Sequence, residues 1–215
     1  MAEERTTGLI LRTRPLTETS LIVHWLTPAL GRVATVAKGA RRPTSPFRGK
    51  LDLFFMAEFS FVRSRRSELH NLREVKVSGT NMALRNDVGY LQQISYGVGL
   101  IETTTEVETP LENIFGLMVQ LLVHLPKRPP EPLTVLGFEI KLLAELGLMP
   151  DLENSKLSPG SRQVFGKLLQ LDWLGLNNLK LSGAQLLEIE QFLQAVIIFH
   201  FGKVPRGRQS ALLLS

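Results

Sequence analysis

The spacing of hydrophobic residues changes near residue 80, and this change limits the folds open to the chain. Before it, apolar and polar residues alternate, as in strands with one buried face. After it, apolar residues recur every three to four positions, as on one side of an amphipathic helix. We therefore expect an α+β protein in two parts, with a β domain over residues 1–79 and an all-α helical domain over residues 80–215.

The first part contains five short segments with strand character, separated by residues typical of turns. The expected strands are residues 7–14, 20–27, 32–38, 51–63 and 69–77. In the third of them Val33, Thr35 and Ala37 share one face. Five short strands with turn-rich connections predict a small closed barrel of the oligonucleotide/oligosaccharide-binding (OB) type. A five-stranded barrel of another kind, such as an SH3-like one, is the structural alternative.

Several helix starts in the second part carry capping residues. Thr109, followed by Pro110 and Glu112, predicts a helix that runs to about residue 125. Ser158 stands before a proline, and Ser182 precedes a glutamine by three residues, so each predicts a further start. Another helix is expected to end near residue 147.

Positive charge is concentrated in the first part of the chain. The net charge is +5, but residues 1–80 hold 14 Lys and Arg against 7 Asp and Glu, a net of +7. The remaining residues hold 11 against 13, a net of −2. A basic segment joined to a slightly acidic one indicates a binding face for a polyanion. A solvated basic surface without a partner is the simpler alternative.

The densest basic cluster follows the third expected strand, in a connection rich in Gly, Pro and Ser. No acidic residue interrupts it between positions 31 and 50. Its cations are Lys38, Arg41, Arg42, Arg48 and Lys50. Because unpaired charges are costly to bury, we expect these side chains on a mobile, solvent-exposed loop, where phosphates would relieve their repulsion. The next connection adds Arg63, Arg65 and Arg66, and in an OB barrel the two connections could flank one groove.

Two aromatic residues near these clusters, Phe47 and Trp25, are candidates for stacking on bases, which contributes ~1–3 kcal/mol per base. Both residue types are more often found in a core. Their burial decides between the two interpretations.

The residues that usually carry catalysis are sparse. The chain has no cysteine, which excludes disulfides, thiolate metal sites and thiol nucleophiles and fits a reducing cytosol. The four histidines are scattered singly, so we expect no metal site, no cofactor and no enzymatic activity. A metal-dependent nuclease that uses Asp87, or Glu102 and Glu106 on one helix face, is the alternative.

No apolar run approaches the ~20 residues of a membrane span, and the N-terminus lacks the order of a signal peptide. We therefore expect a cytoplasmic protein that does not contact the membrane.

Motifs across most of the chain resemble the RecO family of bacterial recombination mediators. In the first part these are Gly8-Leu-Ile-Leu-Arg-Thr-Arg14-Pro15, Glu18-Thr-Ser20, Gly31-Arg32-Val33, Ala37-Lys38-Gly39-Ala40-Arg41-Arg42 and Phe47-Arg48-Gly49. The second part contributes Phe138-Glu139, Leu146-Gly147-Leu148-Met149-Pro150, and Gly202-Lys203 with Pro205 and Arg208.

The resemblance implies a non-catalytic protein that binds single- and double-stranded DNA and anneals complementary strands. It also implies contacts with RecR and with the single-stranded-DNA-binding protein (SSB), so that RecA can load, and a place at the nucleoid. By position, the DNA-binding role would fall on the five loop cations, with Arg12, Arg14 and Arg32 extending the surface. From the second basic cluster, we add Arg65 and Arg66 as expected DNA-binding residues. An RNA-binding OB protein of ribosome assembly or translation is the alternative.

Two departures from the family pattern affect the expected sites. Many members carry a four-cysteine zinc module where this chain has the short, cysteine-free residues 151–158, so we expect no zinc. Some members place an arginine near the Phe138-Glu139 pair to hold the acidic SSB tail, whereas this chain has Leu136-Gly137 there. The cations expected to replace that arginine are Lys141, Arg206 and Arg208.

Overall fold

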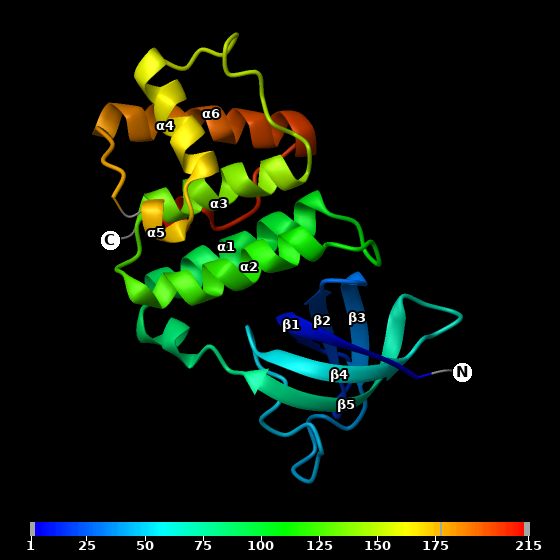
Figure 1. The fold of residues 1–215 in the computed structure, drawn as a ribbon. Coiled ribbons are helices and arrows are strands. Elements are labelled where there is room, and N and C mark those ends of the chain that lie inside the picture. The colour runs from blue at the N-terminus through cyan, green and yellow to red at the C-terminus, as the bar shows by residue number, and fades with distance from the viewer. Residues whose placement is uncertain (1–2, 177, 213–215) are drawn as a thin grey trace. The chain divides into compact units, whose positions relative to one another are not determined.

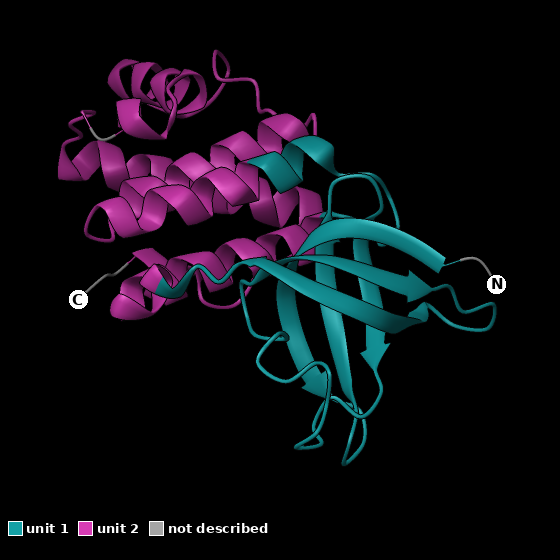
Figure 2. Ribbon diagram, turned by 60° about the horizontal axis from the view of Figure 1, so that its bottom comes forward, with its two compact units in different colours: residues 1–82, 105–116 teal, residues 83–104, 117–215 magenta. Residues whose placement is uncertain are grey.

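The computed structural model describes residues 3–176 and 178–212. The chain forms two compact units (Figure 2), one of residues 1–82 with 105–116 and the other of residues 83–104 with 117–215. The segment 105–116 therefore belongs to the barrel unit, although it follows a long helix of the other unit. The spacing of hydrophobic residues in the sequence does not indicate that the chain returns to the barrel unit at this point.

Five strands form the barrel of the first unit (Figure 1). They are β1 (Glu3–Pro15), β2 (Leu21–Thr27), β3 (Gly31–Ala37), β4 (Met56–Val62) and β5 (Leu69–Gly79). The barrel closes in the order β1-β2-β3-β5-β4, with β3 and β5 parallel and the other pairs antiparallel. The prediction of an OB-type barrel followed by helices is confirmed.

Alternation along the strands fills the barrel interior. Val33, Thr35 and Ala37 are all at most 2% exposed, as their shared face predicts. The ring of Trp25 stacks on that of Phe59 with centroids 4.0 Å apart. An aromatic core of this kind allows a small barrel to bury a large apolar area.

The fourth strand is shorter than predicted. The chain is irregular over residues 51–55, and β4 begins at Met56 rather than at residue 51. Phe54 has a φ of 64°, a left-handed conformation that interrupts a strand. Its amide donates to the Ile10 carbonyl at 2.9 Å, and the Ile10 amide donates to Phe55, so the irregular segment is still fastened to β1.

The second unit is helical, apart from short connections. The helical elements of the chain are η1 (Met82–Asn86), α1 (Val88–Thr104), α2 (Glu112–His124), η2 (Leu125–Lys127), α3 (Pro132–Glu145), α4 (Pro159–Gln170), α5 (Trp173–Leu176), α6 (Gly183–Phe201) and α7 (Arg208–Leu212). Residue 82 of η1 and residues 112–116 of α2 belong to the first unit, and the rest to the second. No helix of the described residues is long and apolar enough to cross a membrane.

Two of the three predicted helix starts are confirmed. The Ser158 hydroxyl accepts from the Ser161 amide, and Ser182 forms a reciprocal capping box with Gln185. The start at Thr109 is wrong. Helix α2 begins at Glu112, and the Thr109 hydroxyl donates to the Val107 carbonyl instead of capping a helix.

Candidate nucleic-acid interface

The connection between β3 and β4, residues 38–55, is a series of consecutive turns. The amides of Arg42, Ser45 and Lys50 donate to carbonyls three residues earlier at 3.0, 3.0 and 3.1 Å. Gly39 and Gly49 take φ values of 70° and 71°, which the turns require and which residues with a Cβ rarely adopt. We call this segment the basic loop.

The basic loop is fastened to the barrel at both a backbone and a side-chain position. The Arg41 amide donates to the Thr19 carbonyl at 3.0 Å, and its guanidinium donates to the Thr17 carbonyl at 3.0 Å. The Phe47 ring is 7% exposed and belongs to the barrel core. The expected mobile loop is therefore held in place by these contacts.

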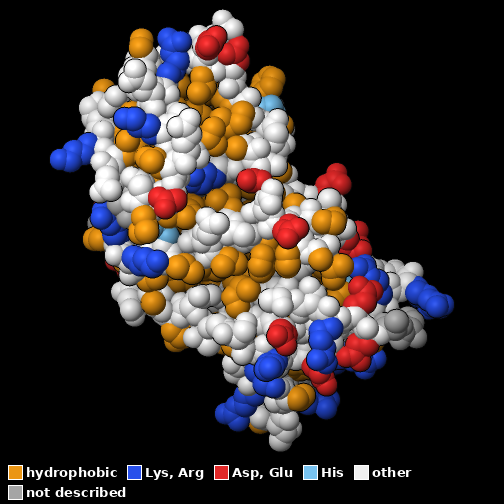
Figure 3. Space-filling model, in the orientation of Figure 1, with side chains coloured by type: hydrophobic (Ala, Val, Ile, Leu, Met, Phe, Trp, Pro, Cys, Tyr) orange, Lys and Arg blue, Asp and Glu red, His pale blue; other side chains and the backbone are white. Residues whose placement is uncertain are grey.

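The cations of the basic loop face solvent. Lys38, Arg41, Arg42 and Arg48 are exposed, and Lys50 is half-buried. Throughout the described residues, no carboxylate forms an ion pair with any of these five. Lysine and arginine side chains gather at this end of the barrel (Figure 3). Their charge is available to an anion from outside the chain.

Three of these cations border one hollow of about 450 Å³. Arg41, Arg42 and Arg48 line it together with the apolar side chains of Leu21 and Leu51. Because the guanidinium groups surround a partly apolar floor, the hollow can take a phosphate together with the hydrophobic part of a nucleotide. We call it the first hollow.

Arg14 and Arg32 have different surroundings. Arg14 is exposed at the end of β1. The Arg32 guanidinium donates to the Thr105 hydroxyl at 2.9 Å and to its carbonyl at 2.5 Å. The Arg32 carbonyl accepts from the Glu108 amide at 2.9 Å. Arg32 therefore fastens the segment 105–111 to β3, and its expected role in extending a DNA surface stays a prediction.

That segment lies so close to the start of β3 that only glycine fits there. A Cβ at Gly31 would stand 1.8 Å from the Thr109 carbonyl oxygen. The Leu111 amide also donates to the Pro28 carbonyl at 2.9 Å. We call residues 105–111 the strap.

The second basic cluster does not border the first hollow. Arg65 and Arg66 are exposed in the β4–β5 connection, which lies on a different side of the barrel from the basic loop in both views (Figures 1 and 2). Arg63 is bound to Glu4 at 2.6 Å and to Glu108 at 2.7 Å. The expectation that the two connections flank one groove is therefore wrong.

Glu108 also accepts from a buried histidine. His70 is 3% exposed, and its Nε2 lies 2.6 Å from the Glu108 carboxylate while its Nδ1 accepts from the Ser64 amide. Partial burial alone would raise the pKa of Glu108, but hydrogen bonds from His70 and Arg63 outweigh it and hold that pKa below 4.5. The strap thus supplies the carboxylate that binds both Arg63 and His70 on this side of the barrel.

Neither aromatic candidate is free to stack on a base. Trp25 is fully buried, and its Nε1 donates to the Thr35 hydroxyl at 2.9 Å. Phe47 is also a core residue. The structure contradicts both stacking assignments, because burying these rings stabilises the barrel and removes them from solvent.

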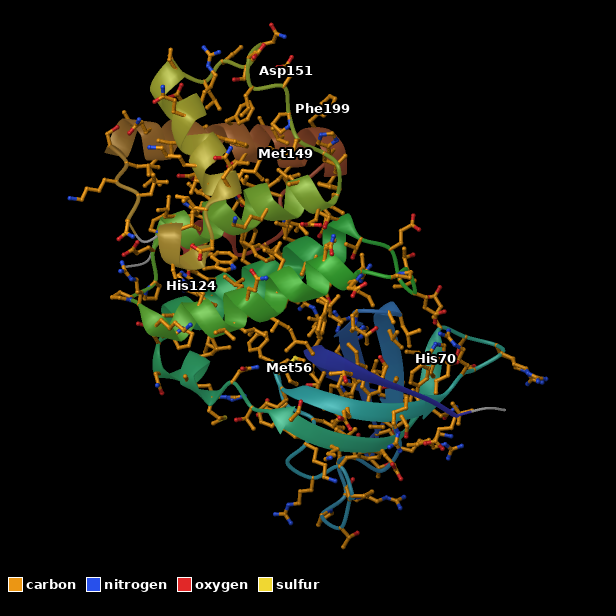
Figure 4. The ribbon with its side chains drawn as sticks, in the orientation of Figure 1. Met56, His70, His124, Met149, Asp151 and Phe199 are labelled. Carbon is orange, nitrogen blue, oxygen red and sulfur yellow. The ribbon has the colours of Figure 1, made fainter. Side chains whose placement is uncertain are left out.

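The carboxylates suggested for a nuclease are not assembled. Helix α1 ends at Thr104, so Glu106 lies in the strap and does not share a helix face with Glu102. The Asp87 carboxylate accepts from the Gly89 amide at 2.7 Å, at the start of α1. In the described part of the chain, no three His, Asp or Glu residues could hold one metal ion, and His70 and His124 lie in different elements (Figure 4).

Comparison with known proteins agrees with these features. The family described as Recombination protein O N terminal matches residues 1–81, and that described as Recombination protein O C terminal matches residues 85–157. The chain belongs to the RecO family.

Several proteins of this family named DNA repair protein RecO align with the chain. The one from Anaeromyxobacter dehalogenans is 31% identical over 71% of this chain, and that from Symbiobacterium thermophilum is 32% identical over 71%. The one from Myxococcus xanthus is 29% identical over 74%. The chain spans 60% of the length of the first two relatives and 66% of the third. The family supports a role in DNA repair.

Two motifs that carry the RecO resemblance meet inside the helical unit. The Arg208 guanidinium donates to Glu139 at 2.6 and 2.9 Å, and the two residues are 5% and 0% exposed. The Tyr96 hydroxyl donates to the same carboxylate at 2.5 Å. Burial and the negative charge of Glu139 together raise the pKa of Tyr96 well above its usual range. Burial opposes the charge on Arg208, but Glu139 outweighs this and raises the pKa of Arg208.

This ion pair changes the expected site for the SSB tail. Arg208 is occupied by Glu139, so its assignment is wrong. Lys141 donates to the carbonyls of Leu169 and Leu171 at 3.1 and 2.6 Å, near the end of α4, so it too is engaged. Burial lowers the pKa of Lys141. Of the three expected cations, Arg206 alone is exposed.

Sequence reasoning overlooked three further cations on the barrel. Arg5, Arg73 and Lys76 are exposed on β1 and β5 and line a hollow that Lys50 also borders. They are separated in the sequence by up to 71 positions, so no local cluster marks them. Strand pairing of β1 with β4 and of β4 with β5 brings them together.

Proposed function

We propose that this RecO-family chain binds single- and double-stranded DNA and anneals complementary strands without catalysing a reaction on them. With RecR it would help RecA to load on DNA coated by SSB, at the nucleoid. The family and its relatives, named as DNA repair proteins, support the general role.

The observation that carries the proposal is the unpaired charge of the basic loop. Its five cations have no carboxylate partner among the described residues, and a core aromatic holds the loop in place. Such a cluster repels itself, and phosphates relieve the repulsion while releasing condensed counterions. Because phosphates carry no base identity, binding should be sensitive to salt and indifferent to sequence.

The same electrostatics explains how annealing would be favoured. Two strands repel each other through their phosphates until cations screen them. A fixed group of cations lowers that repulsion locally and leaves base edges free to pair. No nucleophile or metal is needed for this step, so the chain should not cleave DNA in the presence of Mg²⁺.

The direct test is the salt dependence of single-strand binding. Replacing Lys38, Arg41, Arg42, Arg48 and Lys50 by Gln should flatten the slope of log K against log salt by roughly 3 units, at about 0.7 per lost contact. A matched control replaces five exposed lysines of the helical unit by Gln: Lys127, Lys156, Lys167, Lys180 and Lys203. A slope that changes equally in both variants would show that the basic loop is not the binding face.

Annealing of strands coated by SSB requires a separate assay. Annealing of complementary oligonucleotides coated with SSB should be faster with the chain than without it, and slower with the loop variant. Competition by RNA of the same sequence separates DNA binding from RNA binding, because a strong RNA preference requires contacts to the 2′-hydroxyl. Such a preference would replace this proposal with a role in translation or ribosome assembly.

A further inference from the structure

A second hollow of about 320 Å³ lies on the outer surface of β4 and β5, beside the basic loop. Four cations and two carboxylates line it: Lys50, Arg5, Arg73 and Lys76, with Glu58 and Glu74. The first hollow has a different set of cations, and the two share Phe47 in their linings. The loop residues next to Phe47 line the two hollows separately, Pro46 and Lys50 the second and Arg48 and Gly49 the first.

The strand register builds the second hollow. Arg5 pairs with Ser60 and Ser60 with Glu74, so these three side chains form one row across the sheet. The register shifts between Ser60 and Phe61, which pairs with Leu72. This bulge leaves Arg73 as the extra residue, so Arg73 and Glu74 are both exposed.

A buried hydroxyl marks the floor of this row. Ser60 is 1% exposed, and its Oγ has no hydrogen-bond partner among the described residues. On either side of it, Arg5 and Glu74 join at 3.0 Å, with 67% and 71% of their side chains exposed. An ion pair this exposed contributes only about 0–1 kcal/mol, so a phosphate can take Arg5 from Glu74. A phosphate oxygen in this hollow would give the Ser60 hydroxyl the acceptor that it lacks among the described residues.

We propose that the second hollow binds the phosphates of a second nucleic-acid strand while the first hollow holds another. The inference rests on the proposed function. Each hollow has a net positive lining, with four cations against Glu58 and Glu74 in the second and three against Asp52 in the first. Two separate tracks on either side of the anchored loop would place two strands side by side, each with its own counter-charges.

The test separates binding of the first strand from capture of the second. One variant reverses the second hollow (Arg73→Glu with Lys76→Glu), and another reverses the first (Arg42→Glu with Arg48→Glu). The control, Lys156→Glu with Lys180→Glu, makes the same change of charge on exposed side chains of the helical unit. The probes are a labelled single-stranded oligonucleotide and a second, non-complementary one with a different label, so that base pairing cannot hold the two together.

The first-hollow variant should bind the first oligonucleotide about tenfold more weakly. The second-hollow variant should bind it within about twofold of the original chain, yet capture the second oligonucleotide about tenfold more weakly. Equal loss of first-strand binding in both variants would show one continuous path and overturn the proposal. Unchanged capture by the second-hollow variant would also overturn it. Binding of the first oligonucleotide by the original chain is measured before any variant. If the original chain binds no oligonucleotide, the proposed function fails together with this proposal.

A substitution that is expected to strengthen capture of the second oligonucleotide provides a further test. Glu74→Gln removes the carboxylate that competes for Arg5, so capture of the second oligonucleotide should strengthen about two- to threefold. Glu153→Gln, an exposed acid of the helical unit, is the matched control and should change nothing. Weaker capture by the Glu74 variant would contradict the assignment of Arg5 to a phosphate.

Discussion

The basic loop and the β4–β5 connection look alike in the sequence, because each places several arginines between two strands. In the folded chain they differ. None of the five loop cations has a carboxylate partner among the described residues. In the β4–β5 connection Arg65 and Arg66 are exposed, but Arg63 is bound by Glu4 and Glu108. The acid that matters most, Glu108, lies 45 positions away. A basic cluster therefore indicates a binding surface only when the fold brings no acid to it.

Arg208 is the extreme case of a neutralised cation, and removing its partner should have the largest effect. Glu139→Leu removes the carboxylate that accepts from both the Arg208 guanidinium and the Tyr96 hydroxyl. The buried charge keeps hydrogen bonds to the Glu190 carbonyl and to Gln194 but loses its buried ion pair, so unfolding should become easier by about 3–5 kcal/mol. Urea unfolding followed by circular dichroism measures this loss. Adding Arg208→Met should restore most of it, since the uncompensated charge is then gone. Equal losses in the single and double variants would show that the pair is not the cause.

Glu108 should show an intermediate effect, because its ion pairs are partly exposed. Glu108→Gln should lower the free energy of unfolding by about 1–2 kcal/mol at neutral pH. This is the usual contribution of hydrogen bonds to a charged group, reduced because solvent screens the partly exposed carboxylate. The folded-state pKa of Glu108 lies below 4.5, so its stabilisation is present above that pH and is lost as the pH falls through the folded value. Unfolding measured between pH 7 and pH 3 should therefore show a shallower loss in the variant. Parallel curves would show that Glu108 contributes no pH dependence.

The basic loop should show the smallest effect on stability. Arg42→Gln with Arg48→Gln removes exposed charges that no carboxylate binds, so the free energy of unfolding should change by less than about 0.5 kcal/mol. Thermal unfolding of the variant and of the original chain measures this difference in stability. A loss comparable to that of Glu108→Gln would mean that these arginines hold the loop together, and the contrast between the two regions would no longer stand.

The strand pattern was the most predictable part of the molecule. Alternation identified the buried face of β3, and the serine caps identified the starts of α4 and α6, because both signals are local. The strand predicted for residues 51–63 begins too early, because hydrophobic residues occupy most of the irregular segment 51–55 as well. The sequence gives no sign that Phe54 adopts a left-handed backbone conformation, because phenylalanine rarely has a positive φ.

The site was less predictable than the fold, because its residues meet through pairings distant in sequence. The exposed loop cations were correctly expected to face solvent. The burial of Trp25 could not be distinguished from exposure by residue type alone. Arg73 reaches the second hollow only because a bulge shifts the register of β5. The alternation of apolar and polar residues in the sequence does not predict where a bulge occurs.

The strap also has a consequence for the order in which this chain can mature on the ribosome. Residues 3–79 contain every barrel strand, yet His70 finds its carboxylate, and Arg63 the second of its two, only after residue 108 has been synthesised. Until α1 has left the exit tunnel, the nascent barrel must keep one buried imidazole and one arginine without their final partner. A bulkier residue at position 31 would prolong that unfinished state into the mature protein.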